Sequence, residues 1–165
     1  MTRDLIVFGE DWGGLPSSTQ HLVRRLAQSR KVLWINSIGL RRPKWQWRDV
    51  KRALNKLYRG SQRGVNAAAN EQPCQLRVVN PRTLPAPRGR IERGLAQAML
   101  KHQLQPLLQQ AQLNQPILWT SLPTAVDMAG QLGESALVYY CGDDFAALAG
   151  VDHQVVAERE HELID

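Results

Sequence analysis

DLIVFGEDWGGLPSSTQHL, residues 4–22, decides the fold of this chain. It opens with a compact apolar run of strand length, and a glycine pair, Gly13 and Gly14, follows where the backbone can turn sharply and approach a ligand without a Cβ in the way. Ser17 and Gln20 then stand at capping-box spacing before a helix with one apolar face. Because free N–H groups and the helix dipole point at one spot, this order of elements forms an anion cradle. The segment predicts a phosphate or sugar-phosphate site at the carboxyl edge of a parallel sheet.

The same alternation continues along the chain. Continuous apolar strands separated by helical segments are typical of a parallel sheet covered on both faces. We expect one Rossmann-like α/β domain over residues 1–165, with Pro106 kinking or dividing its longest helix. The expected strands are 4–8, 31–35, 76–79, 116–120 and 136–140; the expected helices are 17–29, 47–59, 90–112, a short one from 121 or 123 to about 133, and 152–165, with a loop at 60–73.

Length and cysteine usage favour a soluble cytoplasmic protein. The chain has 165 residues, enough for one domain with its own core. Its two cysteines, Cys74 and Cys141, lie far apart and suit a reducing compartment, although one long-range disulfide stays open. The apolar stretch at the N-terminus is too short for a signal peptide, and no apolar run approaches the ~20 residues that span a bilayer.

The positive charge is concentrated in one segment. Residues 41–63 hold nine lysines and arginines against one aspartate, so this segment carries +8 while the whole chain carries +6. Trp45 and Trp47 are interleaved with these cations, and an amphipathic helix with such anchors indicates a membrane surface. A nucleic-acid contact or a solvated helix face are the alternatives, and the chain carries no recognised nucleic-acid module.

Three further positions are candidates for ligand contact. Asp143 and Asp144 follow the last strand, where they fit sugar hydroxyls, or one of them caps a helix. Ser121 is most simply the cap of a short helix, and ligand contact is its second interpretation. Trp12 offers either a stacking surface beside the glycine turn or loop packing. No metal is expected, because no set of ligands has suitable spacing, and no cofactor motif of the Gly-x-Gly-x-x-Gly or Walker type follows the first strand.

These segments together resemble the N-terminal domain of a GT-B-fold glycosyltransferase, most closely the retaining family 4 of bacterial polysaccharide type. The resemblance is carried by residues 8–17 (FGEDWGGLPS), 32–36 (VLWIN), 116–119 (PILW) and 138–145 (VYYCGDDF). The last run is similar to a Val-Tyr-Asp-Cys-x-Asp-Asp run of such enzymes, with Tyr140 where that run has an aspartate.

The resemblance implies a hexosyltransferase that moves a sugar from a nucleotide-diphosphate donor to a hydroxyl of a glycan or lipid-linked acceptor. It implies that residues 1–165 are the acceptor-side domain, inactive without a second, donor-binding domain, and that the enzyme works on the inner face of the plasma membrane without a cofactor. It assigns no catalytic residue. It places the donor near Gly13, Gly14 and Trp12, the acceptor near Asp143, Asp144 and Ser121, and an anionic membrane near Trp45, Trp47, Arg48, Lys51 and Arg52.

Two other classes of function stay open. One is a stand-alone Rossmann-like module for a phosphorylated small molecule, and the other is a peripheral membrane or nucleic-acid adaptor. Coding sequence that continues past residue 165 would favour the transferase over the module. An adaptor would lose binding steeply as salt rises. We expect no nucleic-acid partner.

Overall fold

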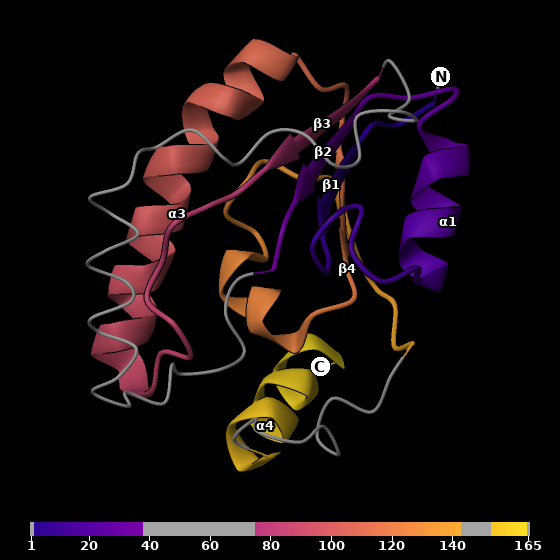
Figure 1. The fold of residues 1–165 in the computed structure, drawn as a ribbon. Coiled ribbons are helices and arrows are strands. Elements are labelled where there is room, and N and C mark those ends of the chain that lie inside the picture. Colours follow the sequence, from indigo (N-terminus) through magenta and orange to yellow (C-terminus); the bar gives the residue numbers. More distant parts are fainter. Residues whose placement is uncertain (1, 38–74, 143–152, 165) are drawn as a thin grey trace, which may run out of the picture.

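The computed structural model describes residues 2–37, 75–142 and 153–164. Strands and helices alternate through most of this part of the chain (Figure 1). The elements are β1 (Leu5–Phe8), α1 (Ser18–Leu26), β2 (Val32–Ile35), β3 (Leu76–Val79), α3 (Gly89–Ala111), β4 (Ile117–Thr120), the 3-10 helix η1 (Pro123–Met128), β5 (Ala136–Tyr139) and α4 (His153–Ile164).

The five strands form one parallel sheet in the order β3-β2-β1-β4-β5. The predicted α/β class and Rossmann-like sheet are therefore confirmed. β1 and β2 are buried at every position, as continuous apolar runs in the middle of a parallel sheet require. The order reverses at β1, so the connections from β1 and β4 leave in opposite directions, and this is the point at which open parallel sheets bind ligands.

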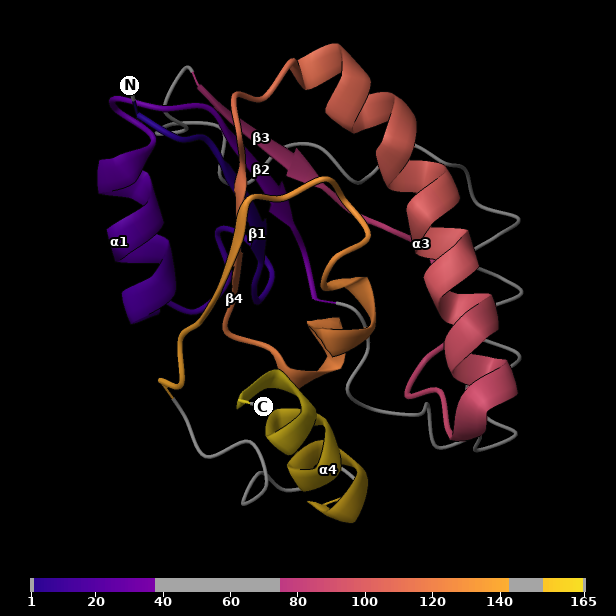
Figure 2. The same ribbon diagram turned by 180° about the vertical axis from the view of Figure 1, so that it is seen from behind.

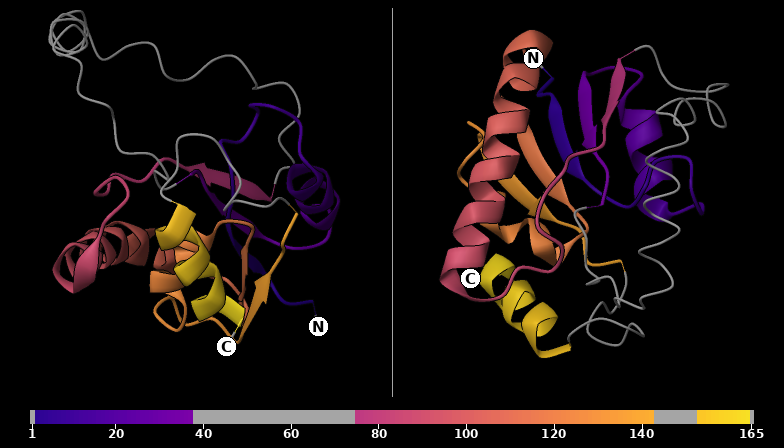
Figure 3. Two further views of the ribbon diagram at one scale, coloured as in Figure 1. Left: turned by 90° about the horizontal axis from the view of Figure 1, so that it is seen from below. Right: turned by 60° about the vertical axis from the view of Figure 1, so that its left-hand side comes forward.

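Helices cover both faces of the sheet (Figures 1 and 2). α1 packs on one face, where Val23 and Ala27 join a core cluster with Val7 and Trp34. α3 and η1 lie on the other face, where a second cluster includes Phe8. Neighbouring strand residues divide between the two clusters because successive side chains point to opposite sides. α4 lies at the carboxyl end of the strands beside η1 (Figure 3).

The start of α1 follows the predicted capping box only in part. The Ser17 hydroxyl accepts a hydrogen bond from the Gln20 amide at 3.1 Å, which satisfies one of the free donors of the first turn. The Gln20 side chain does not complete the box by reaching back to the cap. It turns instead into the loop that precedes the helix.

Pro106 does not divide the long helix. α3 runs unbroken from Gly89 to Ala111 with Pro106 inside it, so the predicted alternative of two helices is wrong. The buried side chains of Leu100 and Leu104 hold the helix against the sheet around the proline, which offsets the missing hydrogen bond. The helix ends at Gln112, which adopts the left-handed conformation of a C-cap.

The element after β4 is shorter than predicted, and Ser121 does not cap it. It is a 3-10 helix that ends at Met128, and Leu122 occupies the cap position without a side-chain hydrogen bond. Pro123 stands in the first turn, where a missing N–H costs nothing. Ser121 therefore needs another explanation.

Several predictions fall on residues outside the described ranges. These are the basic helix at 47–59, the loop at 60–73, and the residues Asp143 and Asp144. The final helix is confirmed as α4. Within the described ranges, every helix is too short or too polar to cross a bilayer.

Candidate functional site

The candidate site lies at the carboxyl edge of the sheet, where the strand order reverses. The backbone ladder continues one residue past the strands, because the amides of Gly9, Asn36, Ser121 and Tyr140 each donate to the last carbonyl of a neighbouring strand. Gly9, Asn36 and Ser121 lie side by side on the face that α1 covers, two positions beyond Val7, Trp34 and Trp119 of the α1 core cluster. Tyr140 joins them there, because its ring stacks on Trp119. The row brings one glycine, one amide and two hydroxyl side chains to the crevice.

Gly9 is required because Trp34 fills the space beside it. A Cβ on Gly9 would lie 2.4 Å from the indole ring of Trp34, which is fully buried. The indole N–H donates to the Glu10 carbonyl at 3.0 Å, so the same ring fixes the start of the loop. Trp12 packs edge-on against Trp34 with ring centroids 4.8 Å apart. The loop after β1 is thus anchored on an aromatic pair.

The loop is also tied to the ends of β2 and β3. The Trp12 amide donates to Asn36 Oδ1 at 2.9 Å, and Asn36 Nδ2 donates to Asn80 Oδ1 at 2.6 Å. Asp11 Oδ1 accepts from both the amide and the hydroxyl of Ser37, at 3.2 and 3.1 Å. These contacts join three strand ends into one polar surface.

The glycine pair makes the turn that the sequence predicts. Gly13 has φ 76°, a left-handed conformation that favours glycine. A Cβ on Gly14 would lie 3.0 Å from the Asp11 carbonyl oxygen, which accepts the Gly14 amide at 3.0 Å. The predicted donor-side residues Trp12, Gly13 and Gly14 therefore lie together in front of the N-terminus of α1.

The Gln20 side chain stabilises this turn by hydrogen bonds to the loop. Its side chain is 5% exposed, its Oε1 accepts from the Gly13 amide at 3.2 Å, and its Nε2 donates to the Leu15 carbonyl at 3.1 Å and to Glu10 Oε1 at 3.2 Å. The Ser17 hydroxyl donates to the same Glu10 oxygen. Sequence reasoning assigned Gln20 to the cap alone and gave Glu10 no partner.

Ser121 contributes a buried hydroxyl to the same edge. The residue is 5% exposed, and its Oγ has no hydrogen-bond partner among the described residues. The neighbouring Thr120 hydroxyl, on the opposite face, bonds to the amide and carbonyl of Leu122. A buried hydroxyl without a partner costs free energy, so Ser121 stays a candidate for ligand contact.

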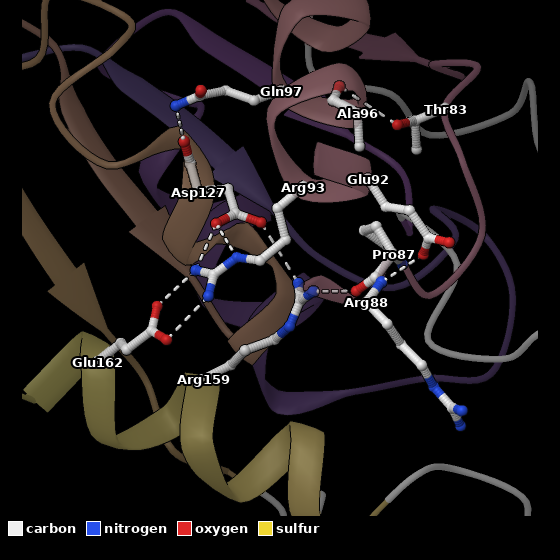
Figure 4. A network of polar contacts seen from close by, with 10 residues as sticks. All are labelled: Thr83, Pro87, Arg88, Glu92, Arg93, Ala96, Gln97, Asp127, Arg159 and Glu162. Atoms are coloured by element: carbon white, nitrogen blue, oxygen red, sulfur yellow. Dashed lines mark hydrogen bonds and ion pairs between the residues drawn. The ribbon is translucent and has the colours of Figure 1, made fainter. Parts of the chain in front are cut away.

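A second polar cluster joins α4 to η1 and α3 (Figure 4). Arg93 of α3 pairs with Asp127 of η1 at 2.6 Å and with Glu162 of α4 at 2.5 Å. Arg159 of α4, 3% exposed, pairs with Asp127 at 3.4 Å and donates to the Pro87 carbonyl at 2.5 Å. The sequence predicts the final helix but does not identify the partners of Arg159, because Asp127 and Pro87 are 32 and 72 residues away from it along the chain.

The four charged residues Arg93, Asp127, Arg159 and Glu162 pair with one another in this cluster. A pocket of about 310 Å³ lies beside it, lined by Arg88, Arg93, Glu158, Arg159 and Glu162 among others. Burial lowers the pKa of Arg159, and the hydrogen bond from Arg93 lowers the pKa of Glu162. On β5, burial is the main cause that raises the pKa of Tyr139, and the hydrogen bond from its hydroxyl to Glu160 adds to it. This 2.5 Å hydrogen bond is a second attachment of α4 to the sheet.

The pairing of Glu162 predicts that the attachment of α4 weakens in acid. A carboxylate whose folded pKa is depressed adds stability above its unfolded pKa, about 4.3, and loses it as pH falls through the folded pKa. Between pH 6 and pH 3 the denaturation midpoint of the wild type should therefore fall further than that of Glu162→Gln. Glu158→Gln on the same helix leaves the pair with Arg93 intact and should behave as the wild type. Equal falls for the wild type and Glu162→Gln would contradict the assignment.

The structure thus brings Trp12, Gly13, Gly14 and Ser121 to one edge of the sheet. Two other sets of predicted residues lie outside the described ranges. These are the acceptor residues Asp143 and Asp144 and the membrane residues Trp45, Trp47, Arg48, Lys51 and Arg52. Among the residues that the structure describes, no group of three histidine, cysteine or acidic side chains is placed to hold a metal. No protein-family model, curated protein or solved structure matches the chain. What the observations establish is a five-stranded parallel α/β fold of Rossmann-like order, with a polar edge at its point of strand reversal.

Proposed function

We propose that this chain is the acceptor-side domain of a glycosyltransferase that uses a nucleotide-diphosphate sugar. The observation that carries the proposal is the coincidence of two features at the strand reversal. One is the glycine turn after β1, and the other is the buried hydroxyl of Ser121 after β4, which has no hydrogen-bond partner among the described residues. In open parallel sheets, small ligands bind in the crevice at this point. The similarity of residues 8–17 and 138–145 to family 4 transferases supplies the reaction class.

In this proposal the domain positions a sugar and excludes water from it. The loop offers the carboxylates of Glu10 and Asp11 on a backbone that the Trp12–Trp34 pair holds in place, and Ser121 adds a hydroxyl. A second domain would close over this edge and complete the donor site, and closure would keep water away from the transfer. A hydroxyl of the glycan or lipid-linked acceptor would receive the sugar.

Binding of nucleotide sugars tests this proposal at residue level. The ¹⁵N-labelled protein is titrated with UDP-glucose, UDP-N-acetylglucosamine and GDP-mannose, and amide shifts are followed. We expect shifts in residues 9–16 and 120–122 for at least one donor. Gly13→Ala should abolish them, because Gly13 has φ 76°, whereas Gly130→Ala, at φ 72° in a remote turn, should not. If neither a donor nor a methyl glycoside moves these amides, the proposed function is rejected.

The same titration separates the stand-alone module from the transferase. A module for a phosphorylated small molecule would respond to glucose 1-phosphate and glucose 6-phosphate as strongly as to any nucleotide sugar. A transferase domain should respond more strongly to the nucleotide sugar or to a glycan. An equal or stronger response to the sugar phosphates would favour the module.

The basic segment predicts binding to an anionic membrane, where a lipid-linked acceptor would lie. We expect sedimentation with phosphatidylglycerol-containing vesicles, and we expect the double variant Trp45→Ala, Trp47→Ala to lose most of it, because tryptophan anchors at the bilayer interface. Trp119→Ala, a tryptophan on the sheet, is the matched control. Binding that is absent in the wild type, or unchanged in the double variant, would contradict the membrane assignment and favour a soluble acceptor.

A further inference from the structure

A carboxylate of the preceding loop lies against side chains of the first turn of α1. Glu10 Oε1 accepts hydrogen bonds from the Ser17 hydroxyl and from Gln20 Nε2 at the first turn of the helix. A negative group at a helix N-terminus stabilises the helix by interaction with its dipole. Glu10 therefore supplies from within the chain the charge that a bound anion would otherwise bring.

The backbone donors of the glycine turn are also engaged. The amides of Trp12, Gly13 and Gly14 donate to Asn36 Oδ1, Gln20 Oε1 and the Asp11 carbonyl oxygen. A phosphate cradle needs such amides free, so that several of them converge on the ligand. The buried Gln20 side chain makes three hydrogen bonds, with the Gly13 amide, Glu10 Oε1 and the Leu15 carbonyl. Freeing the Gly13 amide for a phosphate would leave Gln20 with an unpaired polar atom.

The charge of the loop disfavours an anion further. Glu10 and Asp11 are adjacent carboxylates, and a phosphate placed between them and α1 would meet like charge at short range. Arg24 lies over the Trp12 ring at 5.7 Å and has a further interaction within the chain.

The groups that remain suit a neutral, hydroxyl-bearing ligand. Among the described residues, Glu10 Oε2 and Asp11 Oδ2 accept no hydrogen bond, and both are acceptors for sugar hydroxyls. Ser121, whose buried Oγ has no partner, follows the strand beside β1, and its amide donates to the Phe8 carbonyl oxygen directly before the loop. Its hydroxyl is both donor and acceptor, which matches a hydroxyl of the ligand.

We infer that the β1–α1 crevice binds the uncharged hydroxyl groups of a sugar and rejects phosphate, so that a donor diphosphate is held elsewhere. This inference rests on the proposed function and narrows it. It differs from the anion cradle that the sequence predicts, because the turn amides donate to Asn36, Gln20 and Asp11. The Glu10 carboxylate also lies at the first turn of α1, which local pattern alone does not reveal.

The test compares charged and neutral parts of the same ligands by amide shifts. The ¹⁵N-labelled protein is titrated with inorganic phosphate and UDP, and separately with the methyl glycosides of glucose, mannose and N-acetylglucosamine. We expect a glycoside to move the amides of Gly13, Gly14 and Ser121, and phosphate and UDP to leave them in place. If phosphate or UDP moves them at lower concentration than any glycoside, the inference is overturned while the proposed function stands. If nucleotide sugars and glycosides all leave them unmoved, the proposed function fails as well.

A charge variant provides the second readout. Glu10→Gln keeps an oxygen that accepts from Ser17 and Gln20 but removes the negative charge. We expect it to bind phosphate at this turn about tenfold more tightly than the wild type or better, because one like charge at close range is gone. Glu158→Gln also removes one negative charge, from an exposed residue of α4, and should leave phosphate binding at the turn unchanged. Equal phosphate affinity in the wild type and Glu10→Gln would overturn the assignment of Glu10 as the excluding charge.

Discussion

Trp34→Ala is expected to lower the free energy of unfolding by about 3–5 kcal/mol, the range for removing a large aromatic side chain from a core. The indole is fully buried on the α1 face of the sheet, packs against Trp12, and donates to the Glu10 carbonyl. Its removal leaves a cavity and an unpaired carbonyl at the start of the loop. Urea denaturation followed by circular dichroism measures the change. Trp119→Ala, a half-buried tryptophan on the same face, should cost less.

The pairing of Trp34 with Gly9 gives this prediction a direct control. Gly9→Ala alone should destabilise, because its Cβ would meet the indole ring at 2.4 Å. In the Trp34→Ala background the ring is absent, and the same alanine should cost little or fill part of the cavity. A double-mutant cycle then yields a favourable coupling between the two substitutions. Additive costs would contradict the assigned contact.

Asp127→Ala should have an effect of similar size, about 3–5 kcal/mol, because it removes one partner from a buried ion pair. Arg159 is 3% exposed and relies on Asp127 for its neutralising charge, while Arg93 loses a 2.6 Å contact. The measurement is the denaturant midpoint, together with hydrogen exchange of the α4 amides, which should lose protection first.

A second substitution separates the charge from the packing. In the double variant Asp127→Ala, Arg159→Met no unpaired charge remains, and an apolar side chain of similar length fills the space. We expect it to recover a large part of the stability lost in Asp127→Ala. If the double variant is no more stable than Asp127→Ala, or if Asp127→Ala unfolds at the wild-type midpoint, the ion pair does not hold α4.

All five strands are predicted from the sequence, and the two in the middle of the sheet follow most directly, because a strand buried on both faces must be apolar at every position. Leu5–Phe8 and Val32–Ile35 meet this condition and form β1 and β2, each one residue shorter at its start than the predicted segment. The short helix after β4 is predicted less well. A serine before a proline is typical of an ordinary capped helix, but here the chain makes one tight 3-10 element, with Ser121 left at the end of the strand. Whether Pro106 breaks a helix depends on tertiary packing around Leu100 and Leu104, which periodicity does not measure.

The candidate site shows the same division between local and distant information. The turn at Gly13 and the cap at Ser17 are set by neighbours in sequence, and both are predicted. The Gln20 side chain bonds to the loop only because the loop folds back over it, and the sequence does not predict that fold. Its hydrogen bond to the Gly13 amide is therefore seen only in the structure. The partners of Arg159 come from elements far along the chain, and no spacing rule reaches them.

The edge-on contact of Trp12 with Trp34 gives the loop an optical signal of its own. Two indoles 4.8 Å apart and 69° from coplanar form a coupled pair of chromophores, one fixed in the sheet and one carried by the loop beside the crevice. Any ligand that shifts the loop changes their separation or angle, and therefore changes the circular dichroism and the emission of the unlabelled protein. The chain can thus report occupancy of its own crevice by spectroscopy, through the same ring that makes Gly9 obligatory.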